Sequence, residues 1–166
     1  MPEGPVRCGK TWLRQVGEIR FAPTDPWKHF ESDETFDLSG VNFLWNARVR
    51  MAPMVPAKVT DGFVEGRGFL TARRLGIVTP ARFRGPDTDK GEAMRGLAEQ
   101  PWRPLPFGDV PNVTWQATPA GALSATFDDG RTQVSVEFEL NEEKRTVARR
   151  APDRPRIVGK EPISTP

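Results

Sequence analysis

Residues 89–104 read DKGEAMRGLAEQPWRP, and this stretch has the clearest helical pattern in the chain. Ala93, Met94, Leu97 and Ala98 share one face at helical spacing. A short helix of this kind is not stable alone in water, and its apolar face has to lie on another surface. The rest of the fold must therefore supply that surface.

The ends of this helix are expected at Asp89 and Gln100. We expect the Asp89 carboxylate to accept from the first free backbone N–H groups, with Glu92 completing a capping-box pattern. Pro101 ends the helix, because it lacks a backbone N–H and crowds the residue before it.

Most of the remaining chain alternates apolar and polar residues, which predicts strands with one buried face. Residues 43–51 show the alternation most clearly, and Asp129-Gly130 is the strongest hairpin signal. Alternation favours antiparallel pairing. The predicted fold is mainly β (α+β): a strongly curved antiparallel sheet or half-barrel of about eight strands, with one helix on its concave face.

Length and composition indicate one soluble globular domain. The chain has 166 residues, of which 37% are hydrophobic and 28% charged, and this is not a disordered composition. We expect a flexible N-terminus at residues 1–9, a single curved-sheet domain at 10–158 and a C-terminal tail at 159–166. No signal peptide or transmembrane pattern is present, so the default location is cytoplasmic.

Positive charge is concentrated late in the chain, although the net charge is only +2. Seven cations lie between Lys144 and Lys160, against Asp153 alone. The stretch is expected to be a solvated edge strand and basic tail, or else a contact for an anionic surface: nucleic acid, lipid headgroups or an acidic protein. It contains no aromatic residue, which argues against nucleic acid.

Residues 95–99, followed by Trp102 and Pro104, resemble the R-Y-L-A-E-x-x-W/Y-x-P signature of an uncharacterised bacterial family, a domain of unknown function. Gly96 stands where the signature has tyrosine. Residues 61–68 are similar to that family's D-x-Y/F-x-x-G-x-G hairpin, and the resemblance extends over most of residues 15–166.

The resemblance implies no established activity. The expected architecture is similar to that of the bacterial lipoprotein carriers, which hold acyl chains between a curved sheet and a helix. This likeness is an analogy of fold and does not assign a function.

The chain has no motif for nucleophilic catalysis, phosphate binding or zinc binding. Cys8 is the single cysteine and His29 the single histidine, so no metal site is expected and no cofactor is implied.

We therefore predict a non-enzymatic binding module with an apolar cavity between sheet and helix, for a lipid or another apolar small molecule. Most of the five tryptophans are expected in the core, with Trp102 as a lid over the cavity mouth. The oligomeric state is left open. The candidate ligand-binding residues are Trp45, Met94, Leu97, Glu99, Trp102 and Trp115.

Two alternatives remain open. The first is an enzyme that acts on a polar substrate through Glu99, Asp61 and the pair Arg73 and Arg74. The second is a protein-interaction domain that uses the basic late strand. The carboxylate of Glu99 also has a structural interpretation, an ion pair with Arg95 one helical turn earlier.

Overall fold

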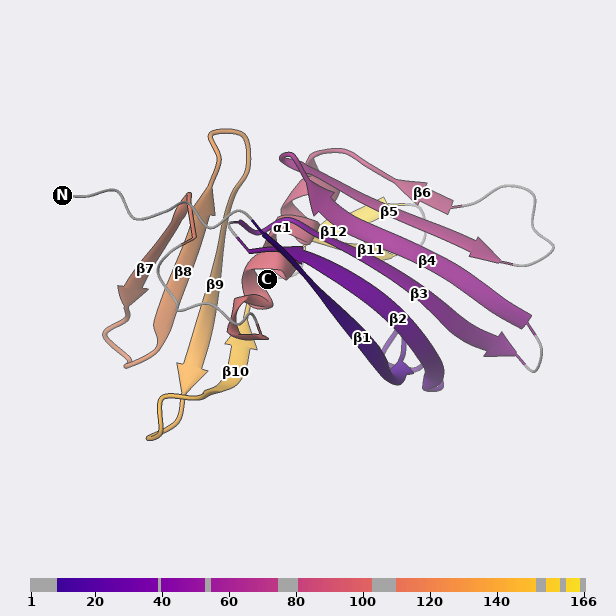
Figure 1. Ribbon diagram of the computed structural model, residues 1–166, viewed down its shortest axis with the longest axis horizontal. Coiled ribbons are helices and arrows are strands. Elements are labelled where there is room, and N and C mark those ends of the chain that lie inside the picture. The colour runs from indigo at the N-terminus through magenta and orange to yellow at the C-terminus, as the bar shows by residue number, and fades with distance from the viewer. Residues whose placement is uncertain are drawn as a thin grey trace.

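Two antiparallel sheets with a helix between them make up the fold (Figure 1). This computed structural model describes residues 9–38, 40–52, 55–74, 81–102, 110–151, 155–158 and 161–164. Within these ranges the predicted class, mainly β with antiparallel strands and one α-helix, is confirmed. The strands divide into two open sheets, however, where the sequence predicted one curved sheet.

The first sheet contains six strands that pair in the order of the sequence, each antiparallel to the next. Its inner face, which faces the helix, carries Phe43, Trp45, Ala47 and Val49, and these alternate with exposed residues on the outer face. The strands are β1 (Lys10–Ile19), β2 (Lys28–Asp37), β3 (Phe43–Ala52), β4 (Val55–Val64), β5 (Arg67–Arg74) and β6 (Ala81–Phe83).

The second sheet contains four strands in the order β10-β9-β8-β7. The predicted hairpin at Asp129-Gly130 joins two of them, with Gly130 in the left-handed region at φ 81°. The strands are β7 (Val113–Ala117), β8 (Leu123–Asp128), β9 (Gln133–Leu140) and β10 (Thr146–Arg150).

A separate two-stranded hairpin follows, formed by β11 (Pro155–Val158) and β12 (Glu161–Ser164). β12 thus lies inside the segment predicted as a C-terminal tail. Residues 1–8 of the predicted flexible N-terminus, residues 1–9, lie outside the described residues.

The helix α1 (Pro86–Ala98) is followed by a short 3-10 turn, η1 (Gln100–Trp102). The predicted cap at Asp89 is wrong, because Pro86 opens the helix with its fixed φ and Gly85 precedes it. The Asp89 carboxylate instead accepts from the Gly68 backbone N–H at 2.7 Å and so ties α1 to β5. No helix in the described ranges is long and apolar enough to span a membrane.

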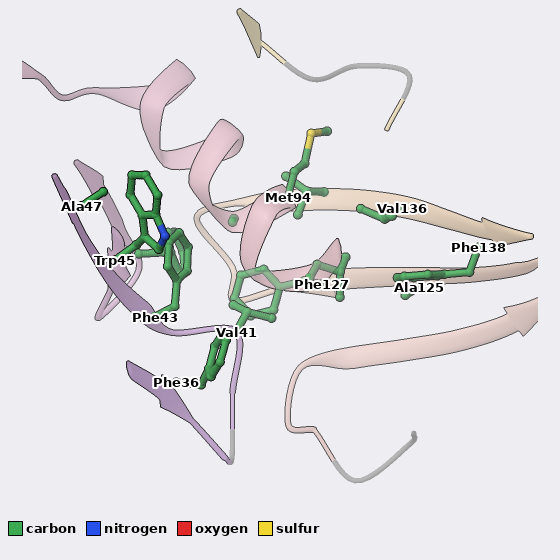
Figure 2. Close-up of a cluster of buried hydrophobic side chains, with 14 of the residues drawn as sticks. Phe36, Val41, Phe43, Trp45, Ala47, Met94, Ala125, Phe127, Val136 and Phe138 are labelled. Carbon is green, nitrogen blue, oxygen red and sulfur yellow. The ribbon is translucent and has the colours of Figure 1, made fainter. Parts of the chain in front are cut away.

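The core lies on both sides of α1. Side chains of β2 and β3 pack on one side of the helix and those of β8 and β9 on the other (Figure 2). Ala93 and Leu97 are fully buried, and Met94 is 4% exposed. The rings of Phe63 and Phe127 meet edge to face at 5.9 Å, so the two sheets also touch directly.

The tryptophans depart from the sequence prediction. Trp45 is buried and Trp115 partly buried, but Trp12, Trp27 and Trp102 are each more than half exposed. The expectation that most tryptophans lie in the core is therefore wrong.

The small residues of α1 allow close packing. A Cβ on Gly96 would collide with the Val41 carbonyl, and a Cβ on Gly68 would collide with the backbone of Thr88. The missing side chains therefore let the helix approach the first sheet closely.

Candidate functional site

Four ionisable side chains meet between α1 and the first sheet and form the Arg95 cluster: Glu34, Asp61, Arg95 and Glu99. The Arg95 guanidinium lies 2.6 Å from Asp61 Oδ2, 2.9 Å from Glu99 Oε1 and 3.2 Å from Glu34 Oε1. Glu34 is fully buried, and less than a fifth of each of the other three side chains is exposed. Three carboxyl groups thus surround one guanidinium inside the protein.

Strand register brings these residues together. Glu34 on β2 is directly opposite Trp45 on β3, and Trp45 is directly opposite Asp61 on β4. These three side chains therefore stand in a row across the inner face of the first sheet. Arg95 and Glu99 reach the same place from α1, one helical turn apart.

Two aromatic rings hold the guanidinium from the sheet side. Its central carbon lies 4.7 Å from the ring centroid of Phe43 and 4.9 Å from that of Trp45. Both distances suit cation–π contacts, which gain strength when water is excluded. Trp45, a predicted ligand-binding residue, therefore contributes directly to the cluster.

Gln15 on β1 extends the cluster toward the edge of the sheet. Its side-chain N–H donates to Glu34 Oε2 at 2.9 Å. Its side-chain oxygen accepts from Trp45 Nε1 and from the Ser32 hydroxyl, each at 2.9 Å. This network satisfies the polar atoms around Glu34 and fixes their orientation.

Burial, and after it the negative charge of Glu99, raise the pKa of Glu34, and Arg95 opposes them; together these effects bring the pKa to about 8. Glu34 is therefore mainly an uncharged carboxylic acid at neutral pH. Burial alone would lower the pKa of Arg95, but Asp61, Glu99 and Glu34 more than offset this and raise it above its ordinary value. With Glu34 neutral, the described members of the cluster are two carboxylates and one cation.

This arrangement can donate and accept hydrogen bonds at neighbouring atoms. Glu34 is an acid held beside the carboxylate of Glu99, and its pKa lies close to physiological pH. The surplus negative charge suits a cationic or hydrogen-bond-donating group. The described residues contain no group of three or more histidine, cysteine, aspartate or glutamate side chains that could hold a metal ion.

The other predicted ligand residues lie elsewhere. Met94 and Leu97 belong to the core around α1. Trp115 lies on the second sheet with its ring 5.6 Å from that of Phe138. Trp102 is 52% exposed beyond the end of the helix, under the guanidinium of Arg149. Only part of the predicted set, Trp45 and Glu99, therefore meets in one place.

The residues of the predicted enzyme site are also divided. Asp61 and Glu99 both contact Arg95, so two of them do come together. Arg73 is exposed on the outer face of the sheet, where it lies directly opposite Lys58 on the neighbouring strand. The side chain of Arg74 lies outside the described residues.

Sequence reasoning missed Glu34 and Gln15. Glu34 lies an even number of positions from Phe30 and Phe36 on β2, so all three side chains share one face of the strand. The sequence therefore places an ionisable residue on a face that carries large apolar side chains. That mismatch was a usable signal, because a buried carboxylate requires partners.

One family model matches the chain, over residues 2–166, and its description is a family of unknown function, DUF6544. No curated protein matches, and no solved structure matches. The signature seen around Gly96 and the likeness to lipoprotein carriers stay predictions.

Proposed function

The chain belongs to the DUF6544 family, whose function is unknown, and we propose that it is a ligand-binding domain without catalytic activity. Its ligand is an amphiphile that lies on the inner face of the first sheet, beside α1. A hydrogen-bond-donating or cationic end points to the Arg95 cluster, and an apolar body lies on the neighbouring strands. The Arg95 cluster is the observation that carries this proposal.

The cluster is costly for the fold. Removing several charged groups from water carries a penalty of several kcal/mol for each ion, and apolar side chains of similar size often replace such groups without loss of stability. Strongly perturbed groups of this kind concentrate at functional sites. Among the described residues of the cluster, carboxylates outnumber cations, and this supports a positively charged or donating partner.

The apolar part of the proposed site lies toward β1. Leu13, 37% exposed, is directly opposite Glu34 on the inner face. Phe30 and Met51 are only partly buried on the same face. Because α1 packs mainly against β4 and β5 in this sheet, the β1 side is less covered by the helix. This leaves apolar surface for a ligand body next to the polar cluster.

Two binding measurements test the proposal. Native mass spectrometry of the purified protein is expected to detect a co-purified amphiphile. A fluorescent dansyl-labelled alkylamine is expected to bind about tenfold more tightly than the uncharged dansyl amide of the same length, because one charged hydrogen bond supplies about 1.4 kcal/mol or more. Absence of both a co-purified ligand and probe binding would overturn the proposal.

A matched pair of variants locates the site. Leu13→Asp puts a charge on the inner face of β1 and is expected to abolish binding of the dansyl alkylamine. Val16→Asp puts the same charge on the outer face of the same strand, where Val16 is 65% exposed, and is expected to leave binding unchanged. Equal effects of both variants would show that the probe binds elsewhere.

A second candidate is an enzyme in which Glu34 donates a proton to a polar substrate. The raised pKa of Glu34 next to the charge of Glu99 favours it, since separated pKa values mark acid and base partners. Glu34→Gln would then abolish turnover while binding persists. Under the binding proposal, the unmodified protein itself is expected to show no turnover of any substrate, so Glu34→Gln changes no activity.

A further inference from the structure

An open pocket of about 370 Å³ lies between the end of the helical segment and the β9–β10 hairpin. Pro101 and Trp102 form one wall, and residues 144–149 form the other. This volume is in the range of small-molecule sites. The pocket is separate from the Arg95 cluster and uses none of its residues.

The lining of this pocket is strongly basic. It includes Lys144, Arg145 and Arg149, and none of the lining residues that the structure describes is acidic. Arg145 forms an ion pair with Glu143 at 3.2 Å, but both side chains are largely exposed. Such a surface ion pair is weak, so another anion can readily replace Glu143 as the partner of Arg145. The pocket therefore offers a net positive environment.

Trp102 supplies a flat apolar surface in the same pocket. Its ring is 52% exposed, and the guanidinium carbon of Arg149 lies 5.0 Å from the ring centroid. Arg149 also donates to the Ala98 carbonyl at 2.9 Å. This bond offsets the negative end of α1, which would otherwise repel an anion.

The turn that presents the cations is held in place by Asn141. The Asn141 side chain accepts from the Arg145 backbone N–H at 2.8 Å, and the Asn141 carbonyl accepts from the Lys144 backbone N–H at 2.9 Å. Lys144 has a φ of 59°, in the left-handed region that is uncommon for a lysine. The backbone of the turn that carries Lys144 and Arg145 is thus fixed at the pocket before any ligand arrives.

We propose that this pocket binds a small anion carried on a flat apolar body, such as an aryl phosphate. Lys144 and Arg145 contact the anionic group, and the flat body lies against the Trp102 ring. The basic stretch of sequence holds no aromatic residue of its own, and the fold supplies one from 42 positions before Lys144.

Titration calorimetry with 1-naphthyl phosphate tests the charges. The double variant Lys144→Gln/Arg145→Gln is expected to bind the probe about tenfold more weakly than the unmodified protein. The control is Arg48→Gln/Lys58→Gln, an equal charge change at two paired positions on the outer face of the first sheet. It is expected to bind as the unmodified protein does.

A second pair of variants tests the aromatic surface. Trp102→Leu is expected to weaken binding of 1-naphthyl phosphate about tenfold, as loss of a stacking partner does. Trp27→Leu is the control, because Trp27 is 58% exposed and has Arg20 over its ring at 4.7 Å. All of these side chains are on the surface, and thermal unfolding checks that every variant remains folded.

The outcomes separate the alternatives. Weakening by the pocket variants alone supports the proposal. Equal weakening by the control variants would overturn it in favour of general charge attraction. Equally tight binding of uncharged 1-naphthol would show that the pocket does not recognise the anionic group, and this would also overturn the proposal. If the protein binds vesicles of phosphatidylglycerol but not 1-naphthyl phosphate, the pocket is a membrane contact and the small-molecule proposal fails.

Discussion

At the scale of single residues, the protonation of Glu34 makes the stability of the fold depend on pH. Its pKa is raised from 4.5 to about 8, so the folded protein keeps a proton that the unfolded chain releases. This contribution to stability is complete below pH 4.5, falls as the pH rises toward 8, and is lost above that value. The slope is at most about 1.4 kcal/mol per pH unit.

Glu34→Gln is expected to remove this dependence, because glutamine stays uncharged. Urea denaturation of the protein and the variant across the same pH window measures the difference in their free energies of unfolding. As the pH rises, the free energy of unfolding of the variant is expected to increase relative to that of the unmodified protein. A difference that does not change with pH would show that Glu34 titrates normally.

Arg95 is the second residue with a defined expectation. Arg95→Met leaves the buried carboxylates without their cation and is expected to lower the free energy of unfolding by about 3–5 kcal/mol. Arg14→Met is the control, since Arg14 pairs with Glu31 at 3.3 Å on the exposed outer face and should cost less than about 1 kcal/mol. Similar losses in chemical denaturation would contradict the importance assigned to the cluster.

At the scale of elements, α1 is held by its apolar contacts on both sheets. Leu97→Ala is expected to cost about 2–5 kcal/mol, because it opens a cavity at a fully buried position. Glu137→Ala, at an exposed position of β9, should change the free energy of unfolding by less than about 0.5 kcal/mol. If chemical denaturation showed a larger loss for Glu137→Ala than for Leu97→Ala, the assignment of buried and exposed faces would be wrong.

Gly96 tests the close approach of α1 to the first sheet. Alanine is a better helix former than glycine by about 1 kcal/mol, so helix propensity alone predicts a gain. The added Cβ would collide with the Val41 carbonyl, and Gly96→Ala is therefore expected to destabilise the protein. Lys90→Ala, at an exposed position of the same helix, should be nearly neutral. A thermal shift upward for Gly96→Ala would refute the close packing.

The elements were also what the sequence could predict best. Alternation located most strands, because one face of each strand is buried and the other meets water, as Phe43 and Trp45 show. Alternation does not say which strands pair, so the division into two sheets did not follow from it. The Arg95 cluster could be predicted only in part: the pair of Arg95 and Glu99 follows from helical spacing, but Glu34 and Arg95 are 61 positions apart and only the fold joins them.

At the scale of the whole molecule, the two sheets are expected to unfold together. α1 packs against β4 and β5 on one side and against β8 and β9 on the other, so neither sheet retains its core without the helix. Backbone amides of β3 and β9 should therefore show the same free energy of opening in hydrogen exchange. Two separate transitions in denaturant would mean that the sheets are independent.

The position of α1 has a consequence for the nascent chain. Each sheet is built from one continuous stretch, and the helix lies between them in the sequence. During synthesis the first sheet can form and receive α1 while β7 to β10 are still missing. The side of the helix that faces β8 and β9 then stays in contact with water until the ribosome has added those strands, which takes a few seconds at about 5–20 residues per second. The rate of translation thus sets how long this apolar surface is open to misassociation.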